Sequence, residues 1–233
     1  DFLPSHAVVK TGGEQGIHAV SAAPYGSVSM LPVTYGYLLM LGAEGLKHVT
    51  EMAILNANYL ASSFEKLGFK ILFKGKQGRV GHEMIWDCSA FNKEYGISEL
   101  DIAKRLMDFG FHAPTLSFPV HGTLMVEPTE SEPKEELDRF IEALKTIREE
   151  MCEVAEGKAD KTDNVLKNAP HTHKVLTADE WTHTYPRSKA AYPLPWVAEN
   201  KFWPQVGRVD DGYGDRNLMC TCDPLYDYVN DEN

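Results

Sequence analysis

The sequence has few cysteines, a deficit of positive charge and no hydrophobic run long enough to cross a bilayer. Its 233 residues include 4 cysteines, and 34 acidic residues outnumber 23 lysines and arginines, which gives a net charge of −11. The longest apolar run, residues 30–41, is too short for a transmembrane helix. These features exclude a secreted disulfide scaffold and a membrane protein, and they argue against nucleic-acid binding. We expect a soluble, intracellular, acidic globular protein.

Motifs for the common nucleotide and hydrolase sites are also missing. The sequence contains no Walker loop, no G-x-G-x-x-G and no nucleophile elbow. Tyr25, Gly26 and Ser27 precede an apolar helix and form a weaker anion motif, because a hydroxyl and free backbone N–H groups at a helix start can hold one phosphate. The same pattern fits a simple helix cap.

Two histidines and two cysteines are further candidates. His171 and His173 could bind a metal, but no third ligand is near in sequence, so we expect a polar surface turn and no metal site. Cys220 and Cys222 have the wrong spacing for a redox Cys-x-x-Cys motif. Buried free thiols and a regulatory redox pair with a distant cysteine both remain open for them.

Composition divides the chain into three regions. Residues 1–41 are poor in charge and end in a helix that is apolar almost all round, which predicts burial in a large core or a subunit interface. Residues 42–156 alternate helix and strand and predict an α+β unit with helices on one face of a small sheet. Residues 157–233 hold 6 of 13 prolines and 3 of 4 tryptophans, which predicts an irregular aromatic arm that wraps over a larger body.

The α+β region can be read in more detail. Its last helix carries most of the net charge, since residues 127–156 hold 11 acids and 4 bases; this predicts a solvated face, with a docking surface for a basic partner as the alternative. Ser98 and Asp101 predict a capping box, and Gly110 a helix end. The expected helices span 42–68, 99–109 and 133–151, and the expected strands span 69–73, 82–88 and 123–126.

Five blocks resemble the C-terminal part of the glycine cleavage system P-protein, the family of pyridoxal-phosphate-dependent glycine decarboxylases. They are residues 21–27, 53–59, 110–115, 122–132 and 213–218. The resemblance implies a fold-type-I architecture like that of aspartate aminotransferase. Residues 1–41 are then the tail of the large cofactor domain with an interface helix, residues 42–156 the small domain, and residues 157–233 the C-terminal extension. Together with the absent initiator methionine, it suggests a piece of a longer polypeptide.

The resemblance also implies an activity. Members of the family are oxidoreductases of glycine catabolism that decarboxylate glycine on pyridoxal phosphate and transfer the aminomethyl group to the lipoyl group of the H-protein. The implied partners are glycine, the H-protein and a second P-protein subunit, in the cytoplasm of a bacterium or the mitochondrial matrix of a eukaryote.

One departure limits what this chain can do alone. The family's Schiff-base lysine stands in a His-Lys-Thr context that is absent here, so we expect no catalytic residue and no activity from this chain by itself. An alternative is a separately encoded, cofactor-free regulatory subunit that uses the acidic helix and the thiols of Cys220 and Cys222.

Supporting residues follow from the resemblance. Tyr25, Gly26 and Ser27 are expected near the cofactor phosphate, and Arg216 is expected to anchor the extension or to touch the lipoyl carrier. Residues 123–126 supply no arginine for the carboxylate of glycine. The residues expected to face the substrate cleft are His112, Pro114, Thr115, Glu127 and Thr129.

Overall fold

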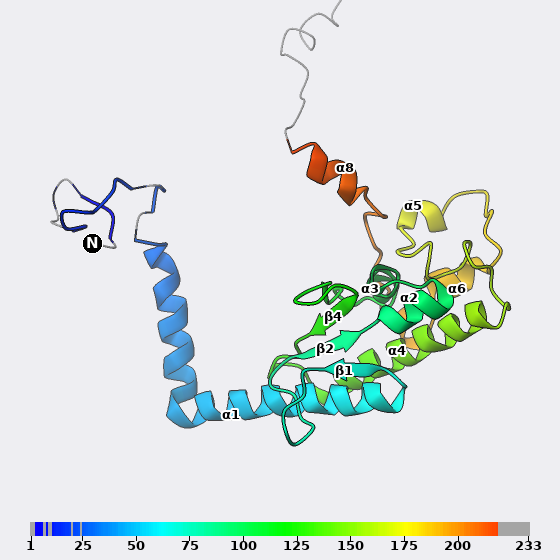
Figure 1. Cartoon of the computed structure of the whole chain (residues 1–233), viewed down its shortest axis with the longest axis horizontal. Helices are drawn as coiled ribbons and strands as arrows, with labels where there is room; N and C mark the ends of the chain where they lie inside the picture. The colour runs from blue at the N-terminus through cyan, green and yellow to red at the C-terminus, as the bar shows by residue number, and fades with distance from the viewer. Residues whose placement is uncertain (1–2, 7, 9–10, 20, 24, 219–233) are drawn as a thin grey trace, which may run out of the picture. The chain divides into compact units, whose positions relative to one another are not determined.

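The computed structural model describes the chain except for residues 1–2, 7, 9–10, 20, 24 and 219–233. Cys220 and Cys222 therefore lie outside the described residues. The described chain forms two compact units, residues 1–55 and 56–233 (Figure 1). No helix among the described residues is long and apolar enough to cross a membrane.

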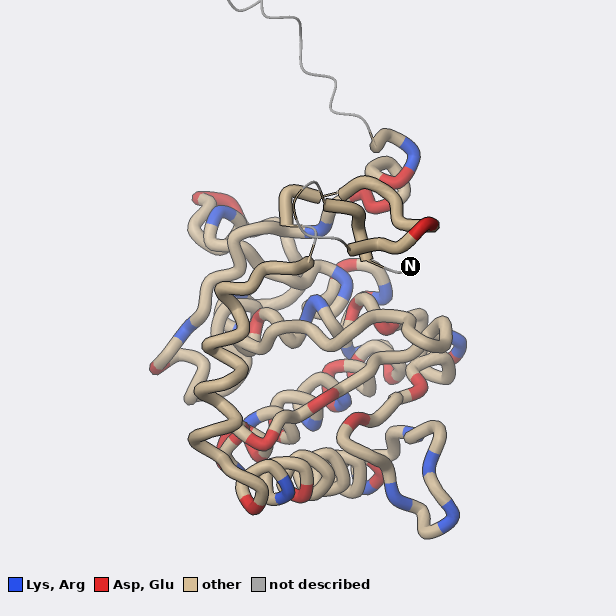
Figure 2. The backbone as a smooth tube through the Cα atoms, turned by 90° about the vertical axis from the view of Figure 1, so that its left-hand side faces the viewer, with Lys and Arg blue, Asp and Glu red and all other residues tan. Residues whose placement is uncertain are grey.

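The first unit contains a loop, a short 3-10 helix η1 (Val28–Met30) and most of the long helix α1 (Leu31–Lys66). Helical geometry breaks at Gly42, whose φ of +60° and ψ of −172° suit glycine but strain a residue with a Cβ. The sequence placed a helix boundary there. In the sequence, Glu14 is the single charged residue between positions 11 and 43. Figure 2 shows the N-terminal part of α1 as an uncharged stretch.

The burial expected for this apolar helix is not provided by the described residues of its own unit. Leu39 is 65 % exposed and Met40 is 87 % exposed. Apolar side chains along a whole helix turn normally require a covering surface, since large exposed apolar patches mark interaction sites. That another surface packs against this apolar helix therefore stays a prediction.

The second unit contains a four-stranded antiparallel sheet of order β1-β2-β4-β3. The strands are β1 (Lys70–Leu72), β2 (Met84–Asp87), β3 (Thr115–Leu116) and β4 (Thr123–Val126). Trp86 pairs with Leu124 across β2 and β4, and both side chains are fully buried. They share one core with the C-terminal part of α1 and with the helices α3 (Glu99–Asp108) and α4 (Lys134–Ala155).

The expected mixed architecture is confirmed, and so are the predicted caps. Ser98 and Asp101 form a reciprocal capping box on α3, and Gly110 follows the helix with φ +85°. Strand β4 matches residues 123–126 as expected. The strand expected over residues 69–73 is shorter in the structure and spans Lys70–Leu72, because Phe73 has a φ of +54° and lies outside it with its side chain 70 % exposed.

Two short elements were not anticipated. They are helix α2 (Ser89–Tyr95) and strand β3, which is two residues long. Elements of this length have too few residues for a hydrophobic period to show.

Most of the described part of residues 157–233 packs on the same unit, whereas its last helix has no buried residue. It includes the short helices α5 (His173–Leu176), α6 (Arg187–Ala191), α7 (Pro195–Glu199) and α8 (Asp211–Arg216). Leu166 and Val197 are buried in the core shared with the sheet. Tryptophan and tyrosine rings of this extension contact one another and the helices below them.

A buried ionic cluster joins the extension to α3 and α4. Arg105 is fully buried and donates to both carboxylate oxygens of Glu150, at 3.0 Å and 2.6 Å, and to Asp108 at 3.0 Å. Its remaining N–H groups reach the backbone oxygens of Lys189, at 3.0 Å, and Ala190, at 3.2 Å, in α6. The guanidinium group therefore connects α3 and α4 to α6.

The expected surface turn at His171 was wrong. His171 is 1 % exposed, with Nδ1 at 2.7 Å from Asp108 Oδ2 and Nε2 at 2.8 Å from the hydroxyl of Tyr185. Its main partner is 63 residues away, so local spacing gave no indication of the burial. Thr172 caps α5, and His173 is exposed on it.

Candidate functional site

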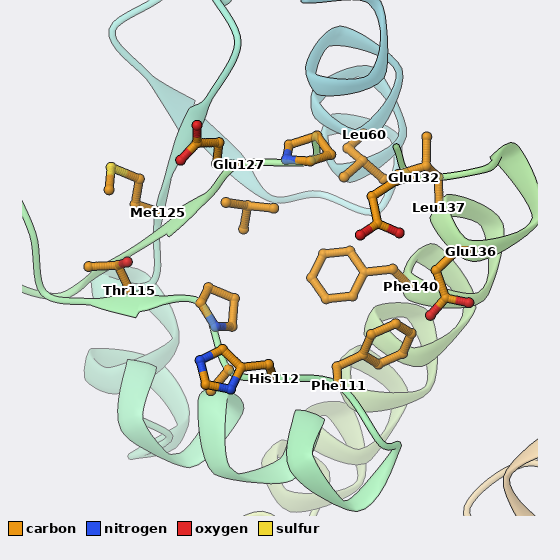
Figure 3. Close-up of a pocket in the computed structure, with 14 residues that line it drawn as sticks. Leu60, Phe111, His112, Thr115, Met125, Glu127, Glu132, Glu136, Leu137 and Phe140 are labelled. Carbon is orange, nitrogen blue, oxygen red and sulfur yellow. The ribbon is translucent and has the colours of Figure 1, made fainter. Parts of the chain in front are cut away.

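A cavity of about 540 Å³ lies between the loop that follows α3, the end of β4 and the start of α4 (Figure 3). Figure 3 shows Met125 and Glu127 on one side, and Glu132, Glu136 and Phe140 on the other. The full lining comprises Leu60, Phe111, His112, Ala113, Pro114, Thr115, Met125, Val126, Glu127, Pro128, Glu132, Glu136, Leu137 and Phe140.

Local structure places each wall of the cavity. Phe111 N–H donates to Leu106 O at 3.1 Å, and the positive φ of Gly110 turns the chain out of α3, so the next residues form a loop over the sheet edge. Antiparallel pairing of β4 with β2 fixes where Glu127 leaves the sheet. Pro133 is the N-cap of α4, and the four-residue spacing of Glu136 and Phe140 puts them one turn apart on the same side of that helix.

Four of the five expected cleft residues line this cavity: His112, Pro114, Thr115 and Glu127. Thr129 does not; its backbone oxygen accepts a 2.9 Å hydrogen bond from Asn56 Nδ2.

The sequence analysis missed the far wall, which consists of Glu132, Glu136 and Phe140. The four-residue spacing of Glu136 and Phe140 on a predicted helix was the available signal, but it did not indicate which way that face points.

The cavity is apolar with an acidic rim. Glu127 Oε1 lies 3.7 Å from His82 Nε2, and Glu136 Oε2 accepts a 2.5 Å hydrogen bond from Arg139. None of the lining residues is lysine or arginine. Because carboxylates repel one another at close range, this lining favours an apolar or cationic group over an anionic one.

Pyridoxal phosphate is the cofactor that the resemblance implies, and Tyr25, Gly26 and Ser27 are the residues expected beside its phosphate. All three are exposed. The Tyr25 hydroxyl lies 2.8 Å from Thr11 Oγ1, and a Cβ added at Gly26 would meet no atom within 4 Å. The Ser27 side chain caps no N–H of η1, so one hydroxyl is available but no close cradle surrounds it. These residues alone do not fit the cofactor.

The other candidate residues from the sequence have less support in the structure. Among the described residues, no group of three or more histidine, cysteine, aspartate or glutamate side chains is arranged to hold a metal ion. Arg216 is exposed at the end of α8. The role of Arg216 stays a prediction.

Residues 49–171 match the family model described as the C-terminal domain of glycine dehydrogenase. The chain belongs to this family. The matched residues include the whole lining of the cavity and the cluster of Arg105, Asp108, Glu150 and His171. The resemblance found in the sequence is thus confirmed.

Relatives of the glycine dehydrogenase family resemble nearly the whole chain. It is 60 % identical over 228 residues to glycine dehydrogenase (decarboxylating) of Flavobacterium johnsoniae, covering 98 % of this chain and 24 % of the relative. The protein of the same name from Bdellovibrio bacteriovorus is 55 % identical over 98 % of this chain and 24 % of the relative. The mitochondrial protein of that name from Dictyostelium discoideum is 56 % identical over 97 % of this chain and 23 % of the relative. The chain spans about a quarter of the length of these relatives.

Proposed function

We propose that this chain is the C-terminal portion of a glycine dehydrogenase (decarboxylating), and that the whole protein decarboxylates glycine and passes its aminomethyl group to a lipoyl-bearing H-protein. The observation that carries the proposal is the 60 % identity over 98 % of this chain to a relative of which it spans 24 %. Identity this high over a full length of chain supports the same architecture and the same chemistry. The proposed site of action is a bacterial cytoplasm or a mitochondrial matrix, and relatives from bacteria and a relative named as mitochondrial support it.

The proposed architecture is that of a fold-type-I enzyme. Residues 1–41 belong to the large domain and the interface with a second subunit, residues 42–156 form the small domain, and residues 157–233 form an extension. Support comes from the exposed apolar helix at Leu39 and Met40, which requires a partner surface, and from the small antiparallel sheet with its helices.

Because Tyr25, Gly26 and Ser27 alone do not fit the cofactor, the whole protein would hold it mainly through residues outside this chain. When bound, pyridoxal phosphate supplies an electron sink for the electron pair released by decarboxylation. This chain contributes the cavity lined by His112, Thr115 and Glu127 as the small-domain wall of the substrate cleft.

The acidic rim of the cavity affects where the carboxylate of glycine can lie. An ion pair with arginine would stabilise the carboxylate before it leaves, and the cavity lining offers no such partner. Glu127 adds negative charge at this wall, whereas Glu136 is paired with Arg139, and the wall favours a substrate whose carboxylate points away from it. The wall therefore excludes water and orients glycine and does not bind its carboxylate.

A bulky substitution in the cavity of the full-length enzyme tests this role. Ala113 lines the cavity, so Ala113→Trp should fill it and lower kcat/KM for release of carbon dioxide from carboxyl-labelled glycine by on the order of tenfold or more. Ala178 is exposed in the extension, and Ala178→Trp is the matched control. Equal kcat/KM for the two variants would contradict the assignment of the cavity to the cleft, and an inactive wild type would contradict the proposed activity.

A further inference from the structure

The side chain of Trp196 in α7 lies against the loop that forms one wall of the cavity. Its ring centroid is 6.2 Å from that of Phe111 in an edge-to-face arrangement, and 6.3 Å from that of Phe109. The indole Nε1 donates to Glu142 Oε2 at 2.8 Å. Val197, the next residue of the helix, is buried in the core and fixes α7 in place.

The segment that follows α7 contacts the same short stretch of chain. Lys201 Nζ donates to the backbone oxygen of Asp108 at 2.6 Å, and the Cβ of Phe202 lies 3.6 Å from the position a Cβ would take on Gly110. Trp196, Lys201 and Phe202 thus all contact the stretch of residues 108–111. We call residues 195–202 the clamp.

A second chain of contacts leads from the clamp to the opposite wall. The Arg139 guanidinium lies 4.3 Å from the ring centroid of Trp196 and donates to Glu136 Oε2. Phe111 in turn packs against Phe140, at 5.1 Å between ring centroids. Phe111, Glu136 and Phe140 all line the cavity, so one tryptophan reaches both the loop wall and the α4 wall.

We propose that Trp196 is a positioning residue, which sets the geometry of the cavity by holding Phe111 and Arg139 together. The inference rests on the proposed function in treating the cavity as part of the substrate cleft. The C-terminal extension then acts on catalysis through the clamp without touching the reacting atoms. The Arg139 guanidinium stacks on the indole face of Trp196, and Phe111 packs against the indole edge to face. These two contacts stabilise the relative positions of Phe111 and Arg139.

Hydrogen exchange of the full-length protein tests the positioning directly and does not depend on activity. Trp196→Ala should speed exchange of the backbone amides of residues 110–113 and 115 by about tenfold, because the aromatic and cation–π contacts that close the loop are lost. Trp196→Phe keeps a ring against Phe111 and should stay within about threefold of wild type. Trp181, which packs on His183 and Tyr185, supplies the matched control Trp181→Ala.

Steady-state kinetics distinguish a positioning role of Trp196 from an effect on the stability of the protein alone. Trp196→Ala should raise KM for glycine by on the order of tenfold, with Trp196→Phe restoring it, whereas Trp181→Ala should lower the melting temperature and leave KM unchanged. The proposal is overturned if Trp196→Ala and Trp181→Ala give the same exchange at residues 110–113 and 115, or the same KM. A wild-type protein that releases no carbon dioxide from glycine would overturn the proposed function, and the exchange result would still decide the positioning.

Discussion

Loss of the Arg105 side chain should destabilise the second unit more than loss of any exposed charge. The guanidinium group has five N–H donors, and all five are used in hydrogen bonds to Glu150, Asp108 and the backbone of α6. Arg105→Met fills similar space but leaves the buried carboxylate of Glu150 without its partner. Burial would raise the pKa of Asp108, but His171 and Arg105 together hold it below its ordinary value, so this carboxylate too is charged.

The magnitude follows from the cost of an uncompensated buried charge. Removing one partner of a buried ion pair costs about 3–5 kcal/mol. With a urea dependence of about 2 kcal/mol per M, the midpoint of unfolding should fall by about 1.5–2.5 M. Adding Glu150→Met to Arg105→Met should recover part of that loss, since an apolar replacement of a buried pair is often close to neutral.

Tryptophan fluorescence is a suitable assay because all four tryptophans, at positions 86, 181, 196 and 203, lie in the second unit. Lys158→Met removes an exposed ion pair with Glu156 and is the matched control, with no measurable change expected. A midpoint for Arg105→Met that equals that of the control would refute the reasoning. So would a double variant that is less stable than Arg105→Met.

Two further predictions concern single titratable groups. Burial, together with the charge of Arg105, lowers the pKa of Lys201 to about 8 despite the nearby carboxylate of Asp108. Between pH 8 and 10.5 Lys201 is therefore protonated in the unfolded chain and mostly neutral in the folded one, so the free energy of unfolding rises with pH. The urea midpoint of the wild type should rise over this window relative to that of Lys201→Met. Parallel plots of midpoint against pH for the two proteins would contradict this. Burial raises the pKa of the Cys88 thiol far above its ordinary value, whereas Cys152 is half-buried with Arg148 at 3.0 Å from its sulfur. Iodoacetamide followed by peptide mass spectrometry should label Cys152 well before Cys88, and equal rates would show that Cys88 is accessible.

Local sequence signals predicted the elements whose chemistry is local. Ser98 with Asp101 and the glycine at position 110 each specify a backbone conformation within four residues, and the structure has both. The helix expected over residues 133–151 likewise corresponds to α4. Strand β3 has two residues, and its pairing depends on β4.

Long-range partners could not be predicted in this way. His171 is buried because Asp108 lies 63 residues earlier in the chain, and the far wall of the cavity depends on how α4 packs against the loop at Phe111. His112, Pro114, Thr115 and Glu127 were expected together because of a family resemblance and not because of their spacing.

The central claim is that this chain forms part of a longer glycine dehydrogenase. An antibody against residues 97–132, used on an extract of the source organism, would measure the mass of the native polypeptide. A band about four times heavier than 26.1 kDa is expected, because the chain spans 24 % of its relative in Flavobacterium johnsoniae. A band at 26.1 kDa would contradict the claim and would favour a separately encoded, cofactor-free subunit.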